Sequence, residues 1–105
     1  MNPPLKFGYL VPTRDAVMRA PDGRADVARM IELAVRAEEK GFDSVWIGDS
    51  ILARPRFEAL TTLAAIAART RRVELGTAVY LSALRHPIPL AHTVGNLDLL
   101  SGGRL

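Results

Sequence analysis

The stretch GFDSVWIGDS, residues 41–50, decides the fold class of this chain. Its centre, SVWIG (Ser44 to Gly48), shows no alternation of polar and apolar residues, which is typical of a strand that is covered on both faces. Gly41 stands before it and supplies the stop of a preceding helix. Asp49 and Ser50 follow it, where parallel sheets carry their functional loops. The segment therefore predicts a buried parallel strand with a helix before it and a polar loop after it.

The same alternation of strand and helix continues on both sides of this segment. Apolar residues at helical spacing predict an amphipathic helix over residues 25–40, and the run from Leu5 to Val11 predicts an earlier strand that Pro12 ends. Residues 12–24 are rich in Pro, Gly and charge and predict a loop. Downstream, the pattern predicts a second helix over residues 57–71, a third strand over residues 73–79 and a third helix from Pro87 to the LSGG stop at residues 100–103.

Three strand-helix units of about 35 residues each predict an α/β fold with parallel strands and right-handed crossovers. Two closed architectures compete on this pattern. A doubly wound nucleotide-binding sheet needs a Gly-rich loop after its first strand, where this chain reads VPTRD (11–15). An eight-unit barrel needs roughly 280 residues, so three units cannot close it.

The end of the chain, LSGGRL (100–105), is expected to lead into a further strand, because Arg104 and Leu105 follow a helix stop. Residues 1–105 are therefore expected to be the amino-terminal part of a larger protein. We expect them to be inactive alone, because the third strand would present an unpaired edge. The alternative is a stand-alone half-barrel that serves as a binding or oligomerisation module, completed as a homo-oligomer or by a second chain.

Composition narrows the classes of function. The chain has 105 residues, 49% of them apolar, no Cys and a formal net charge of +3. The absence of Cys excludes disulfides and thiolate chemistry, and no pair of residues has a metal-ligand spacing. The clustered Arg69, Arg71 and Arg72 suit a helix end better than a nucleic-acid surface. No apolar run is long enough for a signal peptide or a membrane span, so a cytoplasmic location without membrane or nucleic-acid partners is expected.

The carboxyl ends of the three predicted strands are the expected place for a site, because the loops that follow them converge there. Asp49 is able to act as an acid, a base or a hydrogen-bond acceptor, although a loop or helix cap is the simpler interpretation. His86 precedes a helix and is equally well explained as a partly exposed side chain. Trp46 is expected in the core, with a ring that borders a ligand as the alternative. Gly95 is expected to allow close packing of the third helix.

Five pieces of the sequence resemble one family in its order and spacing. They are GFDSVWIGDS (41–50), RP (54–55), EALTTLAAIAARTRRVELGTAV (58–79), RHP (85–87) and NLDLLSGGRL (96–105). Together they resemble the luciferase-like monooxygenases, barrel enzymes that use reduced FMN or the deazaflavin coenzyme F420. The resemblance implies that residues 1–105 are the first three βα units of an incomplete (β/α)8 TIM barrel. It also implies an oxidoreductase that transfers hydride to, or inserts oxygen into, a small organic substrate.

The resemblance further implies a set of site residues. The cofactor ring is expected across the carboxyl-end mouth, with Asp49 as the catalytic or hydrogen-bonding group. Ser50, Thr77, Ala78 and Val79 are expected beside it, with a non-prolyl cis peptide between Ala78 and Val79. Family members often carry His where this chain has Ser50, so a dehydrogenase mechanism with that His as proton donor is not implied.

For the substrate, Arg14 and His86 are the candidates at the rim of the mouth. The groups of the family that bind the cofactor phosphate lie largely in later loops, outside these residues.

Overall fold

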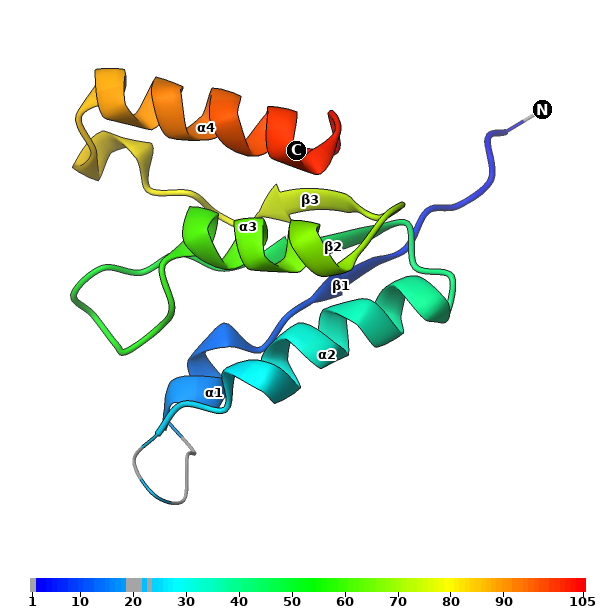
Figure 1. Ribbon diagram of the computed structural model, residues 1–105, viewed down its shortest axis with the longest axis horizontal. Helices are drawn as coiled ribbons and strands as arrows, with labels where there is room; N and C mark the ends of the chain where they lie inside the picture. Colours follow the sequence, from blue (N-terminus) through cyan, green and yellow to red (C-terminus); the bar gives the residue numbers. More distant parts are fainter. Residues whose placement is uncertain (1, 19–21, 23) are drawn as a thin grey trace.

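The computed structural model describes residues 2–18, 22 and 24–105, in which strands and helices alternate (Figure 1). In chain order the elements are β1 (Gly8–Leu10), α1 (Thr13–Met18), α2 (Val27–Glu39), β2 (Ser44–Ile47), α3 (Ala59–Arg69), β3 (Glu74–Thr77), the 3-10 turn η1 (Ser82–Leu84) and α4 (Pro87–Ser101). Each of the three predicted strands and three predicted helices is present, the strands being shorter than the sequence suggested.

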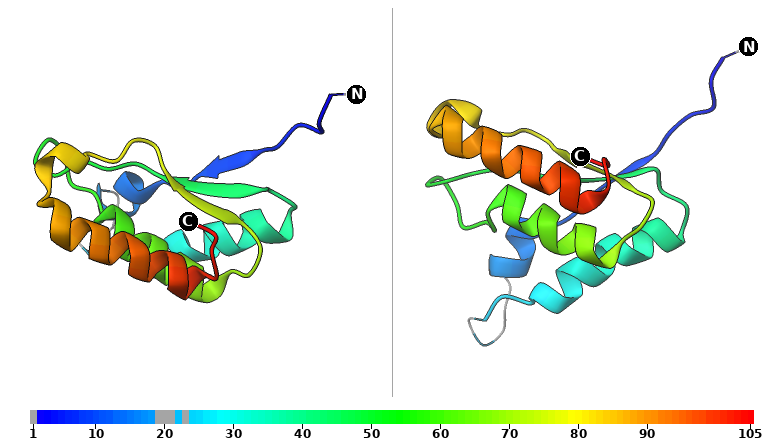
Figure 2. Two further views of the ribbon diagram at one scale, coloured as in Figure 1. Left: turned by 90° about the horizontal axis from the view of Figure 1, so that it is seen from above. Right: turned by 45° about the horizontal axis from the view of Figure 1, so that its top comes forward.

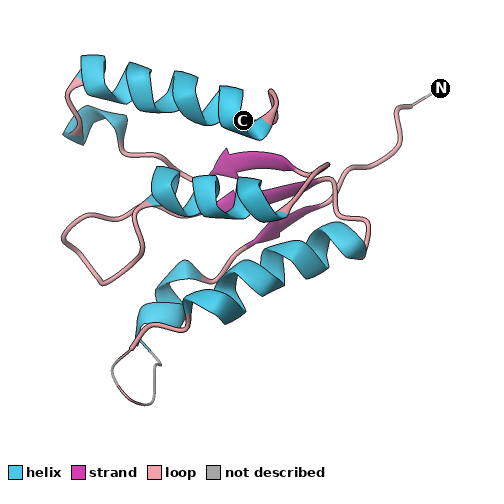
Figure 3. Ribbon diagram, viewed as in Figure 1, coloured by secondary structure: helices cyan, strands magenta, loops and turns pink. Residues whose placement is uncertain are grey.

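The three strands form a parallel sheet in the order β1-β2-β3. Gly8 pairs with Ser44 and Ser44 pairs with Glu74, so the strands start in register and end at one edge. Figure 3 shows the short strands at the centre with the longer helices beside them. Parallel strands joined through helices confirm the α/β fold class and the three βα units.

The helices α2, α3 and α4 lie on one side of the sheet, which the left view of Figure 2 shows from above. The fully buried side chains between the two layers include Val45 and Ile47 of β2, Leu63 and Ile66 of α3, and Val73. Burial of such an aliphatic side chain contributes about 1.5 to 3 kcal/mol each. This layer is the hydrophobic core that fixes the strands and therefore the positions of their carboxyl ends.

The other face of the sheet is open in the described chain, which corrects the expectation for Trp46. Trp46 is 39% exposed, and its Nε1 donates to Ser44 Oγ at 2.8 Å. A Cβ atom at Gly8 or at Gly76 would come within 2.5 or 2.4 Å of the indole ring. The ring therefore spreads over both neighbouring strands in the space that the two glycines leave. The lack of polar alternation predicted that both faces of β2 are covered, but in the described chain the helices cover one of them (Figure 2).

The segment after β1 also differs from its prediction. Residues 13–18 form α1, although the sequence predicted a loop there. Asp15 lies in the first turn, where a negative charge favours a helix, and Ala16 packs against the core. Local charge suggested a loop, but tertiary packing decided the conformation. The rest of the predicted loop includes residues 19–21 and 23, which lie outside the described residues.

The end of α4 agrees with the LSGGRL prediction. Gly102 caps the helix in the left-handed conformation, with φ 72°. The carbonyl of Arg104 then accepts a hydrogen bond from the amide of Leu75 at 2.7 Å, so the backbone at residue 104 lies beside β3. Gly95 does not have the predicted close packing, because a Cβ there would meet nothing within 4 Å in the described chain.

Glu38 joins α2 to the turn before β3. Its carboxylate accepts hydrogen bonds from the backbone amides of residues 71, 72 and 73 at 2.7 to 3.0 Å. Burial acts to raise the pKa of Glu38, but these three hydrogen bonds outweigh it and the net pKa is lowered. Glu38 thus fixes the entry of β3 from a helix more than thirty residues earlier in the chain.

Replacing Glu38 with Gln should lower the free energy of unfolding by about 1 to 3 kcal/mol at pH 7, because charge-assisted hydrogen bonds are lost. Because the pKa of Glu38 is depressed in the folded state, this difference should persist above the unfolded pKa and vanish as the pH falls through the lower folded pKa. Urea denaturation followed by the fluorescence of the single Trp46 measures it.

The matched control is Glu39→Gln, which alters an exposed carboxylate at the end of the same helix. It should change the stability by less than about 0.5 kcal/mol. Equal stability of Glu38→Gln and the unchanged protein at pH 7 would contradict the role given to Glu38.

Candidate functional site

The carboxyl ends of the strands bring three loops together. Val11 donates its amide to the carbonyl of Trp46 at 2.9 Å, and Ala78 donates its amide to the carbonyl of Ile47 at 2.8 Å. These bonds extend the sheet beyond its strands, so the segments after β1, β2 and β3 leave it side by side. Residues 12–14, 48–50 and 77–80 therefore lie at one edge, which the sequence predicted as the mouth.

Asp49 is held at this edge by Arg85. The Arg85 guanidinium donates through Nη2 to Asp49 Oδ1 at 3.0 Å and through Nη1 to Oδ2. The amide of Leu81 also donates to Oδ2, at 2.9 Å. The Asp49 side chain is only 2% exposed, so its two oxygens serve mainly this bidentate pair. Asp49 therefore fixes the loop between β3 and α4 to the end of β2.

The electrostatics around this pair favour its charged form. The hydrogen bond from Arg85 lowers the pKa of Asp49, and the same bond raises the pKa of Arg85. The guanidinium carbon of Arg85 also lies 4.2 Å from the centre of the Tyr80 ring, a cation-π contact. Burial raises the pKa of Tyr80, so its hydroxyl stays protonated at neutral pH. Asp49 in this state accepts hydrogen bonds and does not supply a proton.

Thr77, Ala78 and Val79 stand at the end of β3. The peptide bond between Ala78 and Val79 is cis, as the family resemblance implied. Val79 is 72% exposed and Ala78 is also exposed, so this turn presents apolar side chains to the outside. Together with the half-exposed Thr77 it forms an apolar ledge (residues 77–79) next to the buried carboxylate.

Two further arginines lie at the same edge, Arg14 at the start of α1 and Arg56 in the loop before α3. A Cβ at Gly48 would meet Arg56 Nη1 at 1.5 Å, so this guanidinium lies directly on the backbone at the end of β2. Burial lowers the pKa of Arg56, and the nearby charge of Arg14 lowers it further. The Nε atoms of both arginines and the hydroxyl of Thr13 are buried without a hydrogen-bond partner in the described chain.

The structure gives Ser50 and His86 local contacts. The Ser50 hydroxyl donates to the carbonyl of Arg54 at 3.4 Å, within its own loop. His86 is the N-cap of α4, and its Nδ1 accepts from the amide of Ile88 at 3.3 Å. His86 also lines a hollow of about 290 Å³ together with Glu58, Tyr80 and Arg85. Asp49 and the ledge thus lie together, whereas Ser50 turns into its loop and His86 begins a helix.

Sequence reasoning missed three residues of this edge, namely Arg56, Glu58 and Tyr80. Glu58 caps α3 by accepting from the amides of Leu60 and Thr61, and its Oε1 lies 3.6 Å from Arg85 Nη2. An acidic residue directly before a helical apolar pattern was a usable signal for this cap. Arg56 and Tyr80 gave no local signal, because their positions depend on where two separate loops fold.

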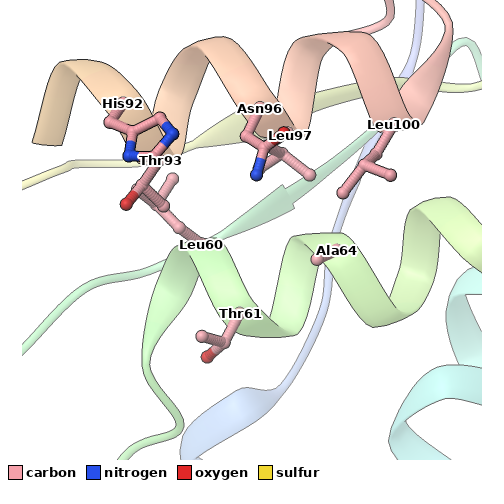
Figure 4. A pocket seen from close by; sticks show the side chains of 8 residues that line it. All are labelled: Leu60, Thr61, Ala64, His92, Thr93, Asn96, Leu97 and Leu100. Atoms are coloured by element: carbon pink, nitrogen blue, oxygen red, sulfur yellow. The ribbon is translucent and has the colours of Figure 1, made fainter. Parts of the chain in front are cut away.

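A second hollow, of about 310 Å³, lies between α3 and α4 (Figure 4). The side chains of Leu97 and Leu100 point from α4 toward α3 in this view. It contains none of the predicted site residues and lies among the helices. In the part of the chain that the structure describes, no three His, Asp or Glu side chains are grouped as metal ligands. The described helices are all too short or too polar to cross a membrane.

Comparison with known proteins gives the family. Residues 5–105 match the sequence profile of the luciferase-like monooxygenases. The chain belongs to this family. It is 42% identical over 83 residues to an F420-dependent glucose-6-phosphate dehydrogenase of Amycolatopsis mediterranei, covering 72% of this chain and 25% of that protein. The chain therefore spans about a quarter of the length of that relative.

Solved structures agree with this assignment. The monooxygenase RslO1 of Streptomyces bottropensis superposes with a TM-score of 0.73 at 34% identity, over 96% of this chain and 31% of that one. The coenzyme F420 dependent tetrahydromethanopterin reductase of Methanopyrus kandleri gives a TM-score of 0.75 at 26% identity, over 94% and 25%. The α/β arrangement of these luciferase-like residues is thus found within larger proteins.

Replacing Asp49 with Ala should release the loop before α4. The amide of Leu81 loses its charged acceptor, so its hydrogen exchange should become roughly 10 to 100 times faster. Exchange measured by NMR at individual amides tests this. The amide of Ala78, which bonds to the carbonyl of Ile47, serves as the internal control and should change much less. An unchanged rate at Leu81 would show that Asp49 does not hold this loop.

Proposed function

We propose that this protein is a flavin- or deazaflavin-dependent oxidoreductase whose cofactor ring lies at the edge formed by residues 12–14, 48–50 and 77–80. The observation that supports this most is the pairing of an exposed apolar ledge, residues 77–79, with a buried and fixed carboxylate, Asp49. A flat aromatic ring with a polar rim needs an apolar support and nearby groups that bind its polar atoms. The cofactor supplies the hydride or oxygen chemistry, and these residues supply position and electrostatics.

The residues fit such a ring in their chemistry. Val79 and Ala78 offer apolar contact, and the half-exposed Thr77 adds a hydroxyl at the end of β3. Among the described residues, Arg85 is the donor to Asp49 Oδ1. Because Arg85 and the Leu81 amide already bind Asp49, its main role here is to position Arg85 and the ledge. The catalytic role predicted for Asp49 from the resemblance remains a proposal.

The relatives favour coenzyme F420 as the first cofactor to test, since the names of two of the three proteins compared above include it. FMN remains the second candidate, because the family resemblance implies either cofactor. Both hydride transfer and oxygen insertion remain candidate reactions for this protein. Ser50 in place of a His argues against a mechanism in which that side chain donates the proton.

A second candidate is a half-barrel module that works through assembly and without catalysis. The open face of the sheet, where Trp46 is 39% exposed, favours it because such a face is normally covered. In this proposal further copies or a second chain cover Trp46. Sedimentation of the 105-residue chain distinguishes the two, because the module needs a defined oligomer.

Titration of the full natural protein with F420 and with FMN, oxidised and reduced, tests the leading proposal. We expect saturable binding of one of them, followed by fluorescence polarisation of the cofactor. Val79→Asp should weaken this binding at least about tenfold, because a charge replaces an apolar contact of the ring.

The matched control is Leu52→Asp, which places the same charge at a side chain that is 95% exposed in the loop after β2. It should leave the affinity unchanged. Equal affinities of both variants would remove residues 77–79 from the cofactor site, and failure of every cofactor form to bind would overturn the proposed function.

A further inference from the structure

Arg14 and Arg56 form a pair of cations at the mouth that the proposed cofactor ring does not explain. Arg56 lies on the backbone of Gly48 after β2, and Arg14 lies in α1 after the neighbouring strand β1. The charge of Arg14 lowers the pKa of Arg56. Two guanidinium groups in such proximity repel each other, and partial burial weakens the screening by water. The arrangement therefore costs free energy unless something negative balances it.

The described chain supplies no adequate counter-charge. Neither arginine makes an ion pair with a described carboxylate, whereas Arg85 takes both oxygens of Asp49. The charge of Asp49 does act on Arg56, but its side chain is 2% exposed and already bound. Glu58 likewise pairs with Arg85, at 3.6 Å between Oε1 and Nη2.

Unsatisfied donors mark the same place. The Nε atoms of Arg14 and Arg56 are buried and have no acceptor among the described residues. Thr13, next to Arg14, is 1% exposed and its hydroxyl is also without a partner. Buried donors of this kind are rare in folded proteins, because each one that lacks an acceptor costs free energy. Three of them at adjacent strand ends indicate a place for a group with several acceptor atoms.

We infer that Arg14 and Arg56 bind an oxyanion, a phosphate or carboxylate group of a small molecule that enters the mouth. Both groups present two or three oxygens, which match the planar fork of donors on a guanidinium. One such group between the two arginines neutralises their repulsion and satisfies the free donors. Binding of an oxyanion by the two arginines does not depend on the proposed function. Only the assignment of that anion to a substrate or a cofactor rests on it.

Inorganic phosphate is the probe for the first experiment, added to the full natural protein at constant ionic strength set with sodium chloride. We expect saturable shifts in NMR spectra that include the side-chain NεH signals of the two arginines. Arg56→Gln and Arg14→Gln should each raise the dissociation constant at least about tenfold, since each removes a charged fork. Neither variant should lower the midpoint of urea denaturation, because the repulsion between the two charges is removed.

Two further variants separate position from charge. Gly48→Ala keeps every charge but places a methyl group where Arg56 Nη1 lies, so it should displace the guanidinium and weaken phosphate binding as Arg56→Gln does. Arg54→Gln removes an exposed charge from the same loop and should leave the affinity unchanged. Phosphate that binds the Arg14, Arg56 and Arg54 variants equally, or does not saturate the unchanged protein, would overturn the inference.

A comparison of FMN with riboflavin, which lacks the phosphate, identifies which molecule carries the anion. If Arg56→Gln weakens FMN but not riboflavin, the oxyanion belongs to the cofactor. If it weakens inorganic phosphate and leaves FMN unchanged, the oxyanion belongs to the substrate. Failure of all cofactors to bind while phosphate still depends on both arginines would refute the proposed function and leave the oxyanion site intact.

Discussion

Parallel pairing of β1, β2 and β3 is the constraint on which the rest of this structure depends. Parallel strands require crossovers, and the crossover helices must bury their apolar sides against the sheet. In this chain they do so on one face, where Val45, Ile47 and Val73 are fully buried. The same pairing sends all three strands toward one edge, so residues that are far apart in sequence meet there.

The chain uses charge to fix its loops at both ends of the sheet. Asp49 ties Arg85 to the end of β2, and Glu38 ties the entry of β3 to α2. Both carboxylates have lowered pKa values because each accepts several hydrogen bonds in its charged form. The strand β3 is therefore held before its start and after its end, which fixes the position of the ledge at residues 77–79. Arg14 and Arg56 lie beyond this balanced network, and their unsatisfied donors set them apart from it.

Much of the fold followed from the sequence because hydrophobic periodicity, Gly41 and Pro87 are local signals. Local signals failed where packing over long distances decides. Residues 13–18 became a helix through contact with the core, and Trp46 lies on the uncovered face because Gly8 and Gly76 leave it room. The strand-end rule placed Asp49 and residues 77–79 at one edge. The strand-end rule did not identify Arg56, because the position of this residue depends on the course of the loop at residues 51–58.

On the open face of the sheet, one large side chain lies between two glycines of the neighbouring strands. Trp46 donates to Ser44, and its ring reaches over Gly8 and Gly76 of the two neighbouring strands. In a barrel, inward side chains from alternate strands share each layer, and a bulky side chain on one strand needs small ones beside it. Gly8 and Gly76 meet this need on either side of Trp46. The sequence of these three strands is thus suited to a closed interior, and the backbone of Arg104, bonded to Leu75, lies beside β3.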